Sequence, residues 1–434
     1  MAGLRRRAPV GRAVHLRAHH ARRRTLHRRR VGALAALAVL GPGLLAGLSD
    51  DDPAGITTYS ILGAQEGYRL LWVLALSTVA LIVFHELAAR TGVVTGKGLV
   101  ALVRERYGAL AAAVAVGALL IANIGTVCAE LAGVAVGADL VFGVPRALSV
   151  PVAVAAVTIL VLAEGFHRVE HVLLAMSTVF ITYFAAGFLA DPDWGAAARG
   201  LVVPSLPGGR DAVLLCVATL GTTLAPWGLA FMQSYAVDKR LSVGDLRLER
   251  VDVATGAILT GVIGLFIAVA CAATLHPTGI TIDDGAQAAR ALEPVAGSAA
   301  SALFGIGLLG AALLAAAIVP LSTAYSVCEA AGRPAGIDEP LRRAPLFYGT
   351  FVGAMVVAAA IVLIPSVSLV PVLYLTQALN AVLLLAILPF MRALAKDPAV
   401  MGEHTLTTAG GVGTLVLIVV IAVACLALLA ASVA

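Results

Sequence analysis

The sequence has few charged residues and few aromatic residues. Of its 434 residues only 13% are charged and 5% aromatic, whereas 60% are hydrophobic. A soluble domain exposes most of its charged side chains and cannot bury this much apolar surface. The composition therefore excludes an ordinary soluble enzyme and predicts a multi-pass protein of the cell membrane, with the lipid bilayer as its surroundings.

Cysteine is scarce throughout, and acidic residues are absent from the start of the chain. The five cysteines are odd in number and all lie in apolar stretches, so we expect buried thiols rather than disulfides or a cysteine metal site.

Residues 1–30 hold eleven arginines and no acid. We interpret 1–30 as a disordered cytoplasmic arm rather than a nucleic-acid binder. No cofactor and no obligate protein partner is indicated.

Long apolar runs fill residues 31–434, which we predict to form one transmembrane domain. A helix needs about 20 apolar residues to cross a bilayer. The candidate spans are 31–62, 67–90, 109–138, 147–163, 169–190, 211–236, 251–275, 298–328, 344–364, 369–393 and 408–433. With the N-terminus inside, 25 of the 30 Lys and Arg residues fall on the inner side. This asymmetry predicts eleven helices, with the N-terminus cytoplasmic and the C-terminus outside.

Two of these spans are interrupted by polar residues and proline. The first contains Asp50-Asp51-Asp52-Pro53-Ala54-Gly55, and each acid would cost about 2.5–3.5 kcal/mol at the centre of a membrane. The sixth carries threonines, Ala225-Pro226-Trp227 and Gly228 over 219–228. Broken helices in matching positions of two five-helix halves are typical of inverted-repeat transporters. We therefore predict an all-α membrane protein with a 5+5 inverted repeat (helices 1–5 and 6–10), an additional eleventh helix, and a cation site at the breaks.

Several motifs occur in an order that resembles a known family. They are Gly41-Pro42-Gly43, Asp52-Pro53-Ala54-Gly55, Thr95-Gly96-Lys97 and Arg104-Glu105-Arg106-Tyr107, the last two in the expected loop between spans two and three. Together they resemble the Nramp family of divalent-metal transporters, and the resemblance covers most of the chain. It implies a LeuT-like fold and transport by alternating access.

The chain departs from the usual Nramp pattern at four positions. Typical members carry Asn at the position of Gly55, Met at Ala225, His at Trp227 and a proton-relay Asp at Val127. This set of replacements is similar to the Nramp-related magnesium transporters. The resemblance thus implies import of Mg²⁺, with Mn²⁺ also accepted, and transport that is not coupled to protons.

The residue types point to a hard ion independently of the resemblance. A thioether favours soft metals, and without a methionine at Ala225 only oxygen ligands remain at the breaks. Mg²⁺ keeps several waters and takes one or two carboxylates. We expect Asp52 as a direct ligand, Asp51 or Glu130 acting through water, and the carbonyls of Gly55 and Thr222 as backbone ligands. Gln377 and Asn380 are one turn apart and either face this site or bond neighbouring helices. The predicted metal site comprises Asp51, Asp52, Gly55, Glu130, Thr222, Ala225, Gln377 and Asn380.

Three other functions remain as alternatives. A proton-coupled Mn²⁺/Fe²⁺ Nramp transporter would normally carry the missing methionine and relay residues. A LeuT-fold carrier for an organic solute is less compatible with three acids, which would repel a substrate carboxylate. An intramembrane enzyme is suggested only by His85-Glu86, and Ala89 stands where a zinc protease has its second His. We predict that the protein is not an enzyme, and that the His85-Glu86 pair, near the inner end of span two, either extends toward the membrane surface or makes a gate contact with Arg90.

Overall fold

The computed structural model describes residues 42–163, 181–279, 282, 285–289, 297, 300–337 and 339–433. The arm at 1–30, the beginning of the first predicted span and most of the fifth lie outside the described residues. The described part of the chain is helical and contains no strand. Within it, nine helices are long and apolar enough to cross a membrane.

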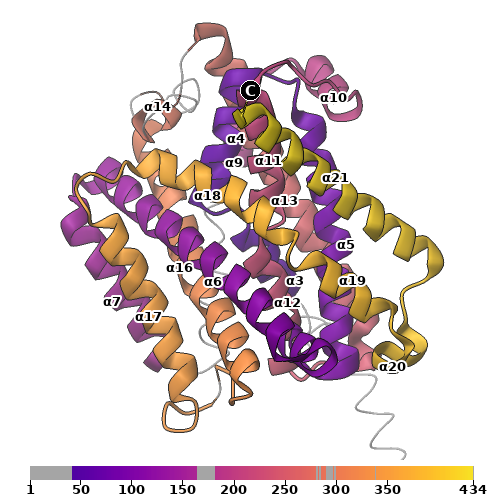
Figure 1. The fold of residues 1–434 in the computed structure, drawn as a ribbon. Helices are drawn as coiled ribbons and strands as arrows, with labels where there is room; N and C mark the ends of the chain where they lie inside the picture. The colour runs from indigo at the N-terminus through magenta and orange to yellow at the C-terminus, as the bar shows by residue number, and fades with distance from the viewer. Residues whose placement is uncertain are drawn as a thin grey trace, which may run out of the picture.

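The helices follow one another with short connections (Figure 1). In chain order they are α3 (Pro42–Ser49), α4 (Pro53–Glu66), α5 (Leu71–Thr95), α6 (Leu99–Phe142), α7 (Arg146–Ala163), α9 (Ile181–Leu189), α10 (Trp194–Val202), α11 (Arg210–Thr223), α12 (Pro226–Asp238), α13 (Leu246–Thr274), α14 (Gly285–Ala289), α16 (Ala300–Ala331), α17 (Pro345–Val362), α18 (Leu369–Leu384), α19 (Leu388–Lys396), α20 (Pro398–Met401) and α21 (Thr408–Val433), with short 3₁₀ turns at Val243–Asp245, His276–Thr278 and Gly402–His404.

The first and sixth predicted spans are broken, as the sequence predicts, but over fewer residues than expected. Only residues 50–52 separate α3 from α4, and only residues 224–225 separate α11 from α12. Pro53 and Pro226 each occupy the first position of the helix that follows, where a missing N–H breaks no helical hydrogen bond. In Figure 1, α3 and α12 lie in the lower half of the molecule, and α4 and α11 lie in the upper half.

Two segments differ from their predicted structure. Residues 99–107, expected in a loop, form the first part of α6, which then turns sharply at Gly108. Gly108 has φ 86°, a conformation that residues with a Cβ rarely adopt. The tenth span, expected as one helix over 369–393, is divided at 385–387 into α18 and α19, with Pro389 in the first turn of α19.

The connections alternate between two ends of the molecule. At one end, Arg106 pairs with Asp397 at 2.8 Å, and loop residues 96–98, 240, 332, 333 and 335 line one pocket. At the opposite end, Trp72 Nε1 donates to the Ser205 carbonyl at 2.9 Å. We name these the α20 end and the α10 end, which lie at the bottom and the top of Figure 1. The alternation agrees with the predicted up-and-down topology.

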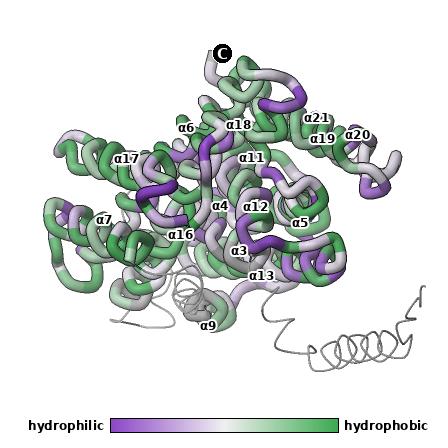
Figure 2. Tube along the Cα trace, turned by 90° about the horizontal axis from the view of Figure 1, so that it is seen from below, coloured by the Kyte–Doolittle hydropathy of each residue, from purple (hydrophilic) through white to green (hydrophobic). Residues whose placement is uncertain are grey.

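The broken helices occupy the centre of the molecule. Every residue of α4 from Pro53 to Ala64 is buried. In the most apolar 18-residue stretch across α11 and α12, 89% of the residues are buried. In the corresponding stretch of α21, only 17% are buried. The peripheral helices α7, α17 and α21 are mainly hydrophobic in Figure 2, as lipid-facing helices must be. The acids of the first break are therefore held away from lipid by surrounding helices.

Candidate functional site

The first break places three buried carboxylates in sequence. Asp50, Asp51 and Asp52 are each at most 3% exposed. Asp52 has an extended backbone and caps α4, because its Oδ1 accepts the N–H of Gly55 at 2.6 Å. Aspartate is a preferred N-cap because its carboxylate satisfies an N–H that has no partner within the helix. The local sequence therefore fixes the orientation of Asp52 while leaving its second oxygen available.

The second break offers backbone oxygen and space instead of charge. Thr222 lies in the last turn of α11, where its carbonyl would normally accept the N–H of the residue four positions later. That residue is Pro226, which has no N–H to donate. Ala225, the N-cap of α12, is buried and contributes only a methyl group. Thr222 and Ala225 thus stand where the sequence analysis expects them.

Gly55 marks the point where the two breaks meet. A methyl group placed on Gly55 would lie 3.2 Å from Thr222 Oγ1, 3.4 Å from Asp52 Oδ1 and 2.9 Å from the Asp50 carbonyl. Gly55 itself belongs to the first turn of α4, not to the unwound stretch. A carbonyl in that turn points along the helix, so the structure gives no support to the predicted coordination by the Gly55 carbonyl, which stays a prediction. Gly55 instead supplies space and the N–H that orients Asp52.

Glu130 completes the charged side of the site. It lies on α6, is fully buried, and its carboxyl group is within hydrogen-bonding reach of the Asp52 carboxyl group. Two carboxyl groups in contact require a shared proton or a cation, because two negative charges repel at this distance. Asp51 is also buried, and its nearest electrostatic neighbours include Asp52 and Tyr59. The predicted acids therefore converge on the breaks from α6 and from the first break itself.

Gln377 and Asn380 form a bonded pair on α18. Asn380 Nδ2 donates to Gln377 Oε1 at 3.1 Å and to Thr126 Oγ1 of α6 at 3.2 Å. Thr126 lies one turn before Glu130, and α18 packs against α4, α6 and α11. The pair thus makes the interhelical bonds that the sequence analysis gave as one of its two alternatives. Asn380 Oδ1 is buried and accepts no hydrogen bond from the described residues.

The donors at the two breaks are oxygen atoms. Among the described residues, no three His, Cys, Asp or Glu side chains gather into a metal-holding group. The five cysteines are free and buried, as predicted. Trp227, at the usual histidine position, is buried, and its indole Nε1 has no hydrogen-bond partner in the described part of the chain. Its carbonyl accepts from Ser322 Oγ at 2.7 Å, which ties α12 to α16.

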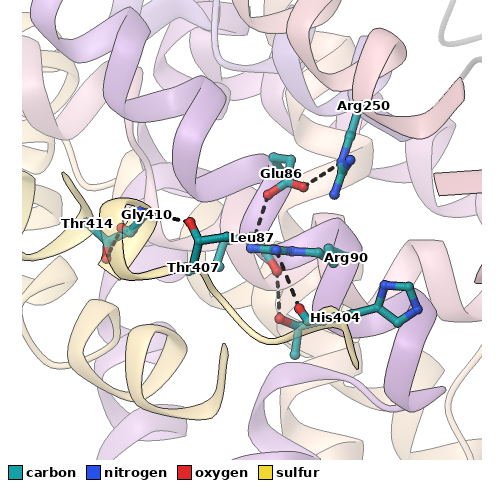
Figure 3. A network of polar contacts seen from close by, with 9 residues as sticks. Glu86, Leu87, Arg90, Arg250, His404, Thr407, Gly410 and Thr414 are labelled. Carbon is teal, nitrogen blue, oxygen red and sulfur yellow. Dashed lines mark hydrogen bonds and ion pairs between the residues drawn. The ribbon is translucent and has the colours of Figure 1, made fainter. Parts of the chain in front are cut away.

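His85 was not among the predicted site residues, yet it is buried on α5 close to Asp50. The available signal was its spacing: Ser77 and His85 are eight residues apart and so share one helix face, and Ser77 donates to Thr223 of α11 at 3.1 Å. The adjacent Glu86 does pair with Arg90, at 3.4 Å, which is one of the two predicted alternatives. Figure 3 shows that Glu86 also accepts a hydrogen bond from Arg250 of α13.

Comparison with known proteins gives the family. The sequence pattern of the family described as "Natural resistance-associated macrophage protein-like", Nramp, matches residues 43–431. The chain belongs to the Nramp family. It is 31% identical over 305 residues to the divalent metal cation transporter MntH of Bacillus subtilis (67% of this chain, 70% of the relative). It is 32% identical over 302 residues to MntH of Burkholderia ambifaria (67% and 68%).

Solved structures give the same fold for this Nramp protein. A crystal structure of the Eremococcus coleocola manganese transporter with an aromatic bis-isothiourea compound superposes with a TM-score of 0.74 at 19% identity, covering 90% of this chain and 86% of that chain. MhsT in complex with L-phenylalanine superposes with a TM-score of 0.60 at 15% identity, covering 90% and 98%. The LeuT-like fold and the family predicted from the sequence are confirmed. Both MntH relatives are transporters and not enzymes, which agrees with the prediction.

Proposed function

We propose that this protein imports Mg²⁺ and Mn²⁺ across the cell membrane by alternating access, without proton coupling. The observation that carries the proposal is the oxygen-only donor set between α4 and α11: the Asp52 carboxylate faces Glu130, and Thr222 presents a carbonyl that Pro226 cannot engage. The relatives named as divalent metal cation transporters support transport of this class of ion.

The geometry favours an ion that remains partly hydrated. Mg²⁺ dehydrates reluctantly and binds one or two carboxylates while keeping waters. Gly55 and Ala225 carry small or no side chains at the breaks and supply no sulfur, the ligand that would select a softer metal. Mn²⁺ also accepts octahedral oxygen ligands. In this assignment Asp52 and the Thr222 carbonyl bind directly, while Glu130 and Asp51 act through water.

The proposal of transport without protons is supported by the buried side chains that replace titratable ones. Val127 and Trp227 are both buried and neither can carry a proton at the positions where the family pattern has Asp and His. The membrane potential supplies enough energy on its own, since two charges gain about 4.6 kcal/mol per 100 mV. A tenfold concentration ratio corresponds to about 1.4 kcal/mol. The energy from the potential can therefore sustain a more than thousandfold accumulation of the ion.

We infer that the α20 end faces the cytoplasm, which places the N-terminus inside and the C-terminus outside. Lys97, Arg104, Arg240 and Arg333 all line the pocket at that end, in keeping with the excess of basic residues in cytoplasmic loops. On this side of the break, α3 is bonded to α13: the Gly43 N–H donates to Asp252 Oδ2 at 2.7 Å, and Thr260 Oγ1 donates to the Gly47 carbonyl.

The test uses the full chain reconstituted in lipid vesicles. Uptake of Mg²⁺ and Mn²⁺ is followed with indicator dyes at an imposed inside-negative potential, together with the interior pH. We expect both ions to enter, each to compete with the other, and the interior pH to stay unchanged. Protein-free vesicles provide the background. Mn²⁺ uptake that excess Mg²⁺ does not reduce would overturn the assignment.

One observation favours a second candidate, a proton-coupled Mn²⁺/Fe²⁺ transporter. The carboxyl groups of Asp52 and Glu130 are in contact, and two carboxyl groups this close can share a proton that could move with the metal. In the same vesicle assay this candidate predicts acidification of the interior in step with metal entry. Acidification that disappears in Glu130→Gln protein, with Mg²⁺ inactive as a competitor, would establish it in place of the first.

A further inference from the structure

A small space beside Gly228 is lined by polar atoms from two other elements. Gly228 lies in the first turn of α12. A methyl group placed on it would find as its three nearest atoms Asp50 Oδ1 at 3.3 Å, His85 Nε2 at 3.4 Å and Asp50 Oδ2 at 4.0 Å. Glycine at this position keeps the space open, and the side chains of the first break and of α5 both point toward it.

These polar atoms have no partners in the described part of the chain. Both carboxylate oxygens of Asp50 and both ring nitrogens of His85 are buried and make no hydrogen bond there. Each side chain belongs to a residue only 1% exposed. A buried polar group without a partner costs about 1–3 kcal/mol, so three such atoms beside Gly228, namely Asp50 Oδ1, Asp50 Oδ2 and His85 Nε2, call for an explanation such as an ion. The neighbouring charges Glu86 and Arg90 are paired with each other instead (Figure 3).

The space is separate from the site at Asp52. The Asp50 backbone carbonyl lies toward Gly55 of α4, whereas its carboxylate lies toward Gly228 of α12. From the breaks, α4 runs toward the α10 end and α12 toward the α20 end (Figure 1), and the Asp50 carboxylate lies beside the first turn of α12. An ion leaving Asp52 toward the α20 end would pass the Asp50 and His85 side chains next.

We propose that Asp50 and His85 form a second cation site, which takes divalent transition-metal ions such as Mn²⁺ in preference to Mg²⁺. The carboxylate supplies charge, and an imidazole nitrogen is a good ligand for first-row transition metals but a poor one for Mg²⁺. At 3.3–3.4 Å from a common point, the two ligands bind an ion after a side-chain rotation or through an intervening water. The proposed transport function gives this site its place on the route, but its binding chemistry stands on these two residues alone.

The two sites then differ in what they retain. The site at Asp52 offers oxygen only, whereas the second site adds nitrogen. Mg²⁺ would pass the second site with little delay, and Mn²⁺ would pause there. The protein therefore holds two Mn²⁺ ions when saturated but one Mg²⁺ ion.

The experiment measures Mn²⁺ binding to the full chain in lipid nanodiscs. Calorimetry and the EPR signal of free Mn²⁺ give the stoichiometry, and electron spin-echo modulation detects nitrogen bound to Mn²⁺. We expect two ions in the wild type, a ¹⁴N coupling, and replacement of that coupling by a ¹⁵N coupling when histidine is ¹⁵N-labelled. His85→Gln should reduce the stoichiometry from two to one and abolish the coupling. Isotope labelling tests the ligand even if the substituted protein is unstable.

A second histidine provides the matched control. His276→Gln should leave both ions and the ¹⁴N coupling in place, because His276 Nδ1 faces the Ala64 carbonyl near the α10 end. Asp52→Asn should remove one ion and keep the nitrogen coupling. A wild type without histidine coupling, or a coupling that survives in His85→Gln, overturns the second site. Two ions and normal transport in Asp52→Asn would instead overturn the proposed function, so the two failures are distinguishable.

Discussion

The broken helices α3–α4 and α11–α12 share a geometry and differ in chemistry. Each resumes at a proline in the first helical position, and each break is buried at the centre of the molecule. The first is capped by the carboxylate of Asp52, the second by Ala225, which has no side chain that caps. The two breaks therefore share a backbone geometry, while the acids lie in the first break only.

The acids of the first break are distributed in different directions. Asp50 lies toward Gly228 and His85, Asp51 toward Tyr59, and Asp52 toward Glu130. The second break adds no charge, and its flanking helices α11 and α12 lie beside these acids. Substitutions in the first break should therefore abolish transport, whereas those in the second should change which ion is preferred.

The largest effect is expected for Asp52→Asn. Asparagine caps a helix about as well as aspartate, so its Oδ1 still accepts the Gly55 N–H and the fold is retained. The charge that binds the ion is lost. We expect Mg²⁺ and Mn²⁺ uptake in vesicles to fall to the level of empty vesicles, with a thermal unfolding midpoint close to that of the wild type. Uptake at the wild-type rate would remove Asp52 from the site.

A smaller effect is expected from Ala225→Met in the second break. The thioether adds a soft ligand opposite Asp52, which should shift competition toward Mn²⁺ over Mg²⁺ by about tenfold, or about 1.4 kcal/mol. Ala225→Leu, of similar size but without sulfur, separates ligand chemistry from loss of space. We measure the Mg²⁺ concentration that halves Mn²⁺ uptake. Interior pH should stay constant in both variants, because Val127 and Trp227 still carry no proton.

The breaks and their acids were predictable because their signals are local. Proline, glycine and consecutive acids within an apolar run are visible without any knowledge of packing. The same reasoning placed Glu130 at the site, since an acid in a membrane span needs a polar neighbour. It also gave, as one of two alternatives, the pairing of Glu86 with Arg90, which are four residues apart on one helix.

The remaining features depend on contacts between distant segments. Gly55 was assigned to the unwound stretch because glycine permits unwinding, yet the Asp52 cap starts the helix before it. Residues 99–107 were assigned to a loop from their charges, but Glu329 of α16 accepts the Val100 N–H at 3.0 Å and so supports a helix start there. The space at Gly228 likewise requires α5 and α12 to be positioned relative to the first break. Such placements follow from packing, which no local pattern specifies.

Thr222→Val tests whether Thr222 in the second break binds the ion through its backbone carbonyl or through its hydroxyl group. Valine removes Oγ1, which has no partner among the described residues, and retains the carbonyl that Pro226 leaves unengaged. We therefore expect uptake to fall only a few-fold, far less than for Asp52→Asn. Thr222→Ser, which keeps the hydroxyl, is the control and should behave like the wild type. A complete loss in the valine variant would mean that the hydroxyl, not the carbonyl, is the ligand.

The smallest effect is expected for a hydrogen bond that links α4 to α11 away from the proposed ion ligands. Tyr59 of α4 shares a hydrogen bond with Thr223 Oγ1 of α11 at 2.9 Å. Tyr59→Phe removes it, but Thr223 Oγ1 still accepts from Ser77 and donates to the Thr219 carbonyl, so no buried group is left unsatisfied. We expect a loss of about 1 kcal/mol in stability, seen as a small drop in the thermal unfolding midpoint, with ion preference unchanged. A changed Mg²⁺ to Mn²⁺ ratio would show that the hydroxyl helps to set the distance between the charged break and the uncharged one.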